Sequence, residues 1–129
     1  MNVKIVEQYI PLAIKYAQPI QRANKHVSLV FCKKQVLAYG TNAYKSDPKS
    51  IQHGYLFGDR HSELAAYVKV RHKINNKSLC LVNYHFNTAL QIKMAKPCNK
   101  CLPWVTEIFD DIWYTTPDGI CQLRKWSID

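Results

Sequence analysis

Two short motifs contain residue types that can bind a metal ion and transfer protons. The first is His61-Ser62-Glu63, and the second is Pro97-Cys98-Asn99-Lys100-Cys101. A catalytic zinc ion usually has three protein ligands and one open position for water, and this set is predicted to be His61, Cys98 and Cys101. The metal lowers the pKa of its bound water towards neutrality and so supplies a nucleophile. Glu63 is too close in sequence to His61 to share the ion comfortably and is predicted to move the protons.

Other interpretations of the two motifs explain less of the sequence. A lone Cys-x-x-Cys pair at a helix start is also typical of thioredoxin-type redox sites, but that interpretation leaves His61 and Glu63 unexplained. A structural zinc site needs a second ligand pair, and the sequence has neither a second Cys-x-x-Cys nor two histidines at the required spacing. Of the four other histidines, only His85 is kept as a candidate site residue.

The elements predicted around the motifs would bring them together. Hydrophobic spacing predicts one helix over 62–73 and another over 98–109, so each motif lies at a helix start. Residues 3–18 also have helical spacing, which Pro11 divides into either a kinked helix or a turn followed by a shorter helix. Strand-like patterns occur at five places, 27–32, 35–40, 79–84, 111–115 and 120–126.

The order of these elements predicts an α/β fold in a single domain, 1–129. Helices on both sides of a five-stranded mixed sheet would form a three-layer α-β-α sandwich. The Thr-Pro-Asp-Gly turn at 116–119 leaves no room for a crossover helix, so strands four and five are expected to form an antiparallel hairpin. Residues 41–60 are predicted to be a long loop, and 90–94 a short extra strand.

Charge and cysteine use indicate the setting of the protein. The chain has 18 Lys+Arg against 9 Asp+Glu, and Glu63 is the only acid between Asp59 and Glu107. Such a field attracts the phosphates of a nucleotide or a polynucleotide, although ordinary solvated lysines explain it equally well. The start of the chain does not resemble a signal peptide, and no apolar run approaches the roughly 20 residues that span a bilayer. We therefore expect a cytoplasmic protein without a membrane partner, with three small buried thiols outside the motifs: Cys32, Cys80 and Cys121.

With the order of elements, the two motifs resemble the cytidine deaminase superfamily of zinc-dependent base deaminases over essentially the whole chain. The resemblance implies one Zn²⁺ per chain with a bound water or hydroxide, and Glu63 as the proton shuttle. It also implies that Asn42, which follows strand two, hydrogen-bonds a substrate sugar. The sequence departs from the free cytidine deaminases in two ways. His61 stands where they commonly use a third cysteine, and an insertion lies at 87–96.

The sequence leaves three functions open. We favour hydrolytic deamination of cytosine to uracil in single-stranded nucleic acid, DNA before RNA, because the chain is basic and aromatic residues flank the motifs. The alternative is deamination of free cytidine, deoxycytidine or their nucleotides, which the hairpin and Asn42 support. A non-catalytic binding module is third, and the presence of Glu63 argues against it. The candidate substrate contacts are Asn42, Tyr44, Lys45, Tyr84, His85, Lys96 and Pro97, with Lys49, Tyr55, Phe57 and Arg60 as further stacking or phosphate contacts.

Overall fold

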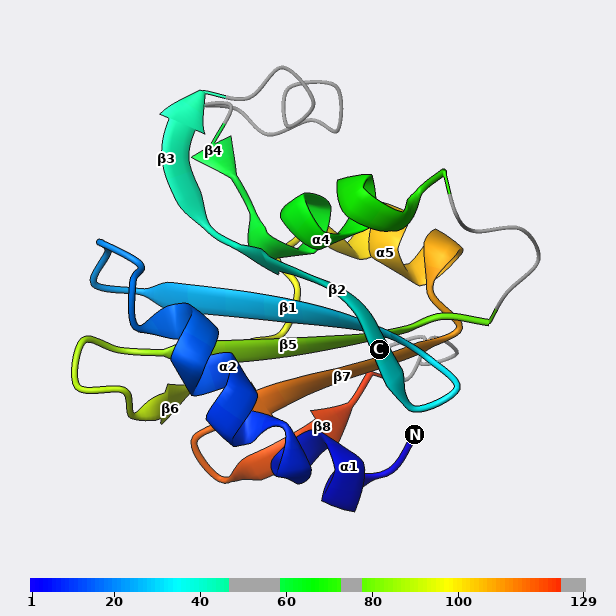
Figure 1. The fold of residues 1–129 in the computed structure, drawn as a ribbon, viewed down its shortest axis with the longest axis horizontal. Helices are drawn as coiled ribbons and strands as arrows, with labels where there is room; N and C mark the ends of the chain where they lie inside the picture. The colour runs from blue at the N-terminus through cyan, green and yellow to red at the C-terminus, as the bar shows by residue number, and fades with distance from the viewer. Residues whose placement is uncertain (47–58, 73–77, 124–129) are drawn as a thin grey trace.

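The computed structural model describes residues 1–46, 59–72 and 78–123, in which a six-stranded mixed sheet lies between helices (Figure 1). The main path of the sheet is β2-β1-β5-β7-β8. These strands are β1 (Lys25–Cys32), β2 (Gln35–Thr41), β5 (Cys80–Phe86), β7 (Asp111–Thr116) and β8 (Gly119–Gln122). The short β6 (Ile92–Lys93) pairs with the end of β5, beyond the residues that pair with β7.

Only one pairing among these strands of the sheet is parallel, that of β5 with β7. The connection between them contains β6 and the helix α5 (Leu102–Ile108), as a parallel pair requires a crossover. The β7–β8 pair is antiparallel and turns at 116–119, where Gly119 has a φ of 144°. The predicted hairpin is therefore confirmed.

Each face of the sheet carries its own apolar core, which confirms the three-layer fold. The helices α1 (Val3–Gln8) and α2 (Ile10–Ala17) cover one face, and α4 (Ser62–Val70) and α5 cover the other (Figure 1). Side chains alternate between the faces along a strand, so neighbours in β1 and β5 belong to different cores. The first core includes Val6, Val27, Val82 and Tyr84. The second includes Val30, Leu64, Leu81, Val105 and Ile112.

Several predicted boundaries differ from the observed ones. The N-terminal segment is two helices that meet at Tyr9, with Pro11 in the first turn of α2. The extra strand is confirmed as β6, so the sheet has six strands where five were predicted. The predicted loop at 41–60 was wrong in part, because β3 (Ala43–Ser46) and β4 (Asp59–Arg60) form an antiparallel pair from its two ends. None of the described helices is long and apolar enough to cross a membrane.

Candidate active site

The first motif lies where α4 begins. His61 is the N-cap, with extended backbone, and Glu63 is in the first turn, where the helix dipole favours an acid. The main-chain N–H of Ala65 donates to the carbonyl of His61 at 3.0 Å, which fixes the ligand to the helix start. This end of α4 lies directly on β2 at Gly40. A Cβ atom at Gly40 would be 2.3 Å from the nitrogen of Ala66 and 2.4 Å from the oxygen of Ser62, so only glycine permits this approach.

The second motif forms a tight turn ahead of α5. The N–H groups of Cys101 and Leu102 both donate to the carbonyl of Cys98, at 3.0 and 2.9 Å. The helix therefore begins at Leu102, four residues later than the sequence predicts. Pro103 lies in its first turn, where the missing N–H has no helical partner to lose. The turn places both thiols on the side that faces α4.

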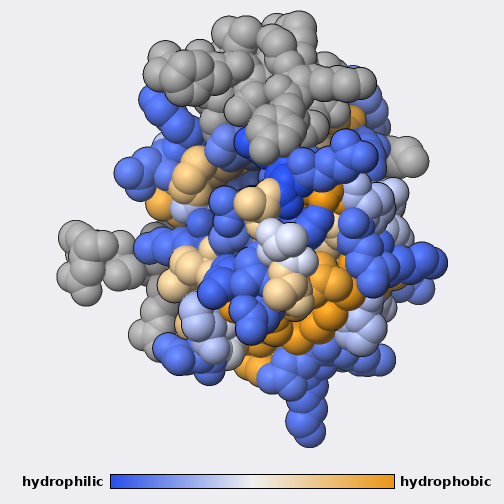
Figure 2. Space-filling view, turned by 90° about the vertical axis from the view of Figure 1, so that its left-hand side faces the viewer, coloured by the Kyte–Doolittle hydropathy of each residue, from blue (hydrophilic) through white to orange (hydrophobic). Residues whose placement is uncertain are grey.

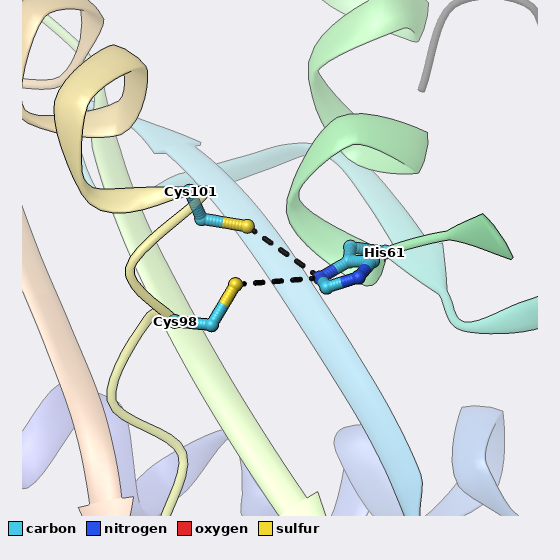
Figure 3. Close-up of side chains that lie close together, drawn as sticks. All are labelled: His61, Cys98 and Cys101. Atoms are coloured by element: carbon cyan, nitrogen blue, oxygen red, sulfur yellow. Dashed lines mark hydrogen bonds between the residues drawn. The ribbon is translucent and has the colours of Figure 1, made fainter. Parts of the chain in front are cut away.

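The three predicted ligands meet in one place (Figure 3). The Nδ1 atom of His61 is 3.7 Å from the sulfur of Cys98 and 3.6 Å from the sulfur of Cys101, and all three atoms lie within 4.8 Å of one another. In tetrahedral zinc sites, Zn–N bonds of about 2.05 Å and Zn–S bonds of about 2.3 Å place nitrogen and sulfur about 3.6 Å apart. The side chains therefore fit a single zinc ion, with a fourth position for water or substrate.

The electrostatics of the turn also favour metal binding, because a thiolate is the metal-binding form of cysteine. The hydrogen bond with Cys101 has the largest effect on the pKa of Cys98, and the bond with His61 and main-chain N–H groups of the turn act in the same direction. Together they outweigh the opposing effect of burial and lower this pKa to about 3. Cys101 is completely buried, whereas Cys98 is exposed towards the cavity described next.

A cavity of about 380 Å³ opens beside the ligands and gives access to both His61 and Glu63. Its volume is in the range typical of small-molecule sites. The residues that line it are Arg22, Ala23, Asn24, His26, Asn42, His61, Ser62, Glu63, Asn83, Ala95, Lys96 and Cys98. Figure 2 looks onto the end of the molecule that carries the loop before β1 and the β5–β6 turn, where hydrophilic side chains predominate above an apolar area.

Glu63 lies in the wall of this cavity and is only 6% exposed. Its Oε1 accepts from the hydroxyl of Ser62 at 3.2 Å, and its Oε2 accepts from the side-chain amide of Asn83 at 3.2 Å. Both oxygens of the carboxylate are therefore held by hydrogen bonds. The carboxylate has a fixed position beside the metal-binding group, as an acid/base residue requires.

Asn42 lines the cavity, but its side chain is bonded to the protein main chain. Its Oδ1 accepts from the N–H of His26 at 2.9 Å, and its Nδ2 donates to the carbonyl of Asn24 at 2.9 Å. The amide therefore holds the loop that enters β1. One amide hydrogen of Asn42 is left for a substrate, so the predicted sugar contact remains a prediction.

Tyr84 was predicted to contact the substrate, and this prediction was wrong. The residue is completely buried in the core under α1 and α2, on the opposite face of β5 from the cavity. Its hydroxyl donates to the carbonyl of Val6 at 2.8 Å. Because strand residues alternate between faces, its neighbour Asn83 lines the cavity instead.

His85 does not line the cavity but packs against His26, which does. Its ring stacks on that of His26, with centroids 4.0 Å apart, and its Nδ1 is 2.7 Å from the carbonyl of Met94. A carbonyl only accepts, so Nδ1 of His85 carries the hydrogen. Burial, followed by repulsion from His85, lowers the pKa of His26 from 6.5 to about 4. His26 is therefore a neutral ring in the cavity wall near pH 7.

The other predicted contacts divide into three groups. Lys96 lines the cavity, whereas Pro97 is buried next to it. The main chain of Tyr44 and Lys45 belongs to β3, and that of Arg60 to β4, but their side chains lie outside the described part of the structure. Lys49, Tyr55 and Phe57 also lie outside the described residues.

The sequence interpretation missed most of the cavity wall. Asn83 carried a signal, because it is a polar residue in the otherwise apolar start of β5. Ser28 has the same signal in the apolar centre of β1. Arg22, Asn24 and His26 had none, since they lie in an ordinary polar segment before a strand and reach the site only through the fold.

Known structures resemble the whole chain. It superimposes on the crystal structure of a dCMP deaminase from the cyanophage S-TIM5 with a TM-score of 0.60 at 20% identity, over 90% of this chain and 86% of that one. A cytidine deaminase from Mycobacterium leprae gives a TM-score of 0.54 at 14% identity, over 92% and 90% of the two chains. The chain has the cytidine deaminase fold. No protein-family model matches the sequence, and no curated protein sequence is significantly similar to it.

The cytidine deaminase fold explains why the two motifs converge. It places both at helix starts on the same side of one sheet, where α4 and the turn before α5 meet. The fold does not select a substrate, because one similar structure is a dCMP deaminase and the other a cytidine deaminase.

Proposed function

We propose that the protein is a zinc-dependent hydrolase that deaminates a cytosine base to uracil. The observation that carries the proposal is the convergence of His61, Cys98 and Cys101 at zinc-binding distances, with the held carboxylate of Glu63 in the same cavity. Three ligands leave one position open, which is typical of a catalytic zinc site. The resemblance of the motifs to the superfamily and the similarity of the fold support the same reaction.

The residues divide the work of the reaction. His61, Cys98 and Cys101 hold the metal, which when bound supplies Lewis-acid activation of water. Glu63 takes a proton from the attacking water as the new C–O bond forms at C4 of the base. It then delivers protons to the ring nitrogen N3 and to the departing amine, so that cytosine and water become uracil and ammonia. The buried wall around Glu63 restricts the access of other water.

For the substrate, we infer a free pyrimidine nucleoside or nucleotide ahead of single-stranded nucleic acid. The similar structures are enzymes of a nucleotide and a nucleoside by name, which supports this order. Arg22 and Lys96 both line the cavity and give it positive charge, which favours a substrate with a phosphate. We therefore expect a monophosphate to be used better than its nucleoside.

The reaction is tested by incubating the purified protein with cytidine, deoxycytidine, dCMP and a cytosine-containing DNA oligonucleotide, followed by measurement of uracil and ammonia. We expect turnover of the mononucleotide with at least a tenfold higher kcat/KM than the nucleoside. Cys98→Ser removes one predicted zinc ligand and should lose activity. Cys121→Ser is the matched control, because it removes an exposed thiol outside the site and should keep activity. Absence of product from every substrate by zinc-loaded protein would contradict the proposal.

Deamination within single-stranded nucleic acid remains the second candidate because of the net charge of +9. Binding of an oligonucleotide through phosphates weakens steeply as salt rises. If the oligonucleotide is the substrate, its kcat/KM should fall by at least tenfold between 50 and 200 mM salt and exceed that of the mononucleotide at low salt. Turnover of mononucleotides alone would exclude this candidate.

A further inference from the structure

Two polar side chains face each other in the centre of the sheet, where apolar residues surround them. Ser28 in β1 is opposite Asn83 in β5, and the two residues are 0% and 4% exposed. Both lie on the face that carries α4. A buried polar group costs free energy unless it is hydrogen-bonded, so a polar pair at this position needs a partner.

The hydrogen bonds of Asn83 determine how its amide is oriented. Its Nδ2 donates to Oε2 of Glu63 at 3.2 Å and to the carbonyl of Ala95 at 3.3 Å, and its Oδ1 accepts from the hydroxyl of Ser28 at 2.6 Å. A flipped amide would place Oδ1 against two groups that only accept. The carbonyl of Ala95 and the hydroxyl of Ser28 therefore orient the amide so that one N–H of Asn83 donates to Glu63.

Ser28 reaches Glu63 by a second route as well. Its hydroxyl oxygen is 2.7 Å from that of Ser62, and because Ser28 gives its own hydrogen to Asn83, Ser62 is the donor in this contact. The single hydrogen of Ser62 is then shared between Ser28 and Oε1 of Glu63, which lies 3.2 Å from the Ser62 hydroxyl. Ser62 is also only 3% exposed. Ser28 is thus linked to one carboxylate oxygen through Asn83, and it shares the hydroxyl hydrogen of Ser62 with the other oxygen.

Asn83 also joins the two segments that carry the metal ligands. Glu63 follows His61 at the start of α4, whereas Ala95 precedes the turn that contains Cys98 and Cys101. The main-chain N–H of Ala95 is itself held by the carbonyl of Thr115 at 2.8 Å, so the segment is anchored to β7. A single amide on the central strand therefore fixes the carboxylate relative to the cysteine turn.

We propose that Ser28 and Asn83 are positioning residues that hold the Glu63 carboxylate in its working orientation beside the metal group. This proposal rests on the proposed function. Neither residue needs to contact the reacting atoms, since both act through Glu63. A small displacement of an acid/base group is sufficient to slow a reaction strongly.

The kinetic test uses Ser28→Ala, which deletes one hydroxyl, and Asn83→Asp, which keeps the shape but replaces the donor by an acceptor. Zinc content, kcat and KM are measured for each. We expect kcat to fall about 10-fold for Ser28→Ala and about 100-fold for Asn83→Asp, with KM within about threefold and zinc unchanged. The matched control is Thr116→Val, which removes another buried hydroxyl bond, to Gly119 in the β7–β8 turn. Its kcat should stay within twofold.

A second readout does not depend on activity. The side-chain amide of Asn83 is observed by NMR in ¹⁵N-labelled protein and assigned through its loss in Asn83→Asp. We expect slowly exchanging amide protons whose shifts change in Ser28→Ala and in Glu63→Gln, but not in Thr116→Val. This measurement also covers the case in which Asn83→Asp does not fold, because the assignment can then be made with Asn83→Gln.

The two proposals fail in different ways. If the zinc-loaded protein deaminates nothing while the amide signals respond as expected, the proposed function is wrong and the hydrogen-bond network stands. The positioning role is overturned if Ser28→Ala keeps kcat within twofold of wild type, or if its loss of kcat is matched by an equal loss of zinc. The positioning role would also be overturned if the NMR shifts of the Asn83 side-chain amide stay unchanged in both Ser28→Ala and Glu63→Gln.

Discussion

Glu63 has surroundings unlike those of a surface carboxylate. It is almost fully buried, both of its oxygens accept hydrogen bonds, and the nearest metal-binding side chain is two residues away. It belongs to a helix start whose dipole favours negative charge. These features hold the Glu63 carboxylate in place beside the three side chains that could bind a metal, as the proposed proton transfer requires.

Replacing Glu63 by glutamine should separate metal binding from chemistry. Glu63→Gln keeps the shape and one acceptor but cannot take a proton, so we expect one zinc per chain and a loss of activity of about 10³-fold. Zinc is measured by atomic absorption, and activity by release of ammonia and formation of the uracil-containing product. A variant that stays fully active would show that another residue shuttles the proton.

His26 should make the stability of the protein depend on pH. Its pKa is lowered from 6.5 to about 4 by burial and nearby positive charges, so the unfolded chain binds this proton more readily than the folded one. The contribution of the neutral ring is fully present above pH 6.5 and is lost as the pH falls from 6.5 towards 4. We expect the free energy of unfolding to drop by roughly 2 kcal/mol between pH 7.5 and 5 from this residue alone.

The measurement is urea denaturation of wild type and His26→Gln at both pH values. The variant should show a pH-dependent drop smaller by about the same 2 kcal/mol. His72→Gln is the control, because this histidine is exposed and does not line the candidate-site cavity. An equal drop in wild type and His26→Gln would contradict the assignment.

At the scale of elements, the position of α4 depends on its contact with β2. The backbone of the helix passes so close to Gly40 that a methyl group would overlap the main chain of Ser62, Ala65 and Ala66. Main chain cannot rotate away as a flexible side chain can. The metal ligand at the N-cap of this helix is therefore placed by a glycine on a neighbouring strand.

Gly40→Ala should consequently damage both stability and the site. We expect a loss of about 2–3 kcal/mol in the free energy of unfolding, as for other overpacked contacts. Because α4 must shift, zinc affinity should fall by at least tenfold. The free energy of unfolding is measured by denaturation, and the zinc affinity by competition with a chelator. Wild-type zinc affinity in Gly40→Ala would show that His61 is positioned in some other way.

The elements were predictable where the signal is local and less so where it depends on distant pairing. The β7–β8 hairpin is a short stretch with strong local chemistry and was confirmed, and the structure brings the side chains of the two short ligand motifs together. The pairing of β3 with β4 joins residues separated by more than ten positions, so no local pattern revealed it. The choice of Tyr84 instead of Asn83 was an error of one residue, which in a strand exchanges the two faces of the sheet.

In the molecule as a whole, the metal would join two segments that are far apart in the sequence. His61 is the N-cap of α4, whereas the cysteines belong to the turn before α5, so one ion held by these residues would link positions 37 residues apart. Binding energy gained only in the folded state adds to stability. The metal is therefore expected to support the fold as well as the reaction.

Removal of the metal should lower the melting temperature. With free zinc at about 1,000 times its dissociation constant, the bound ion contributes about 4 kcal/mol, which for a chain of this size is on the order of 10–15 °C. Calorimetry with and without a chelator measures the shift. Cys98→Ser should melt at a lower temperature than wild type and lose most of its response to the chelator, whereas Cys121→Ser should respond like wild type. An unchanged melting temperature on chelation would exclude a tightly bound ion.

The Ser28–Asn83 pair has one more consequence, for how the chain folds. A shift of β1 by one residue against β5 would turn Ser28 into the apolar core under α1 and α2, without a partner for its hydroxyl. It would also expose Val27 and Leu29 to the polar wall of the cavity. The same pair thus penalises misaligned strands, so the residues proposed to position Glu63 would also favour the correct alignment of β1 with β5.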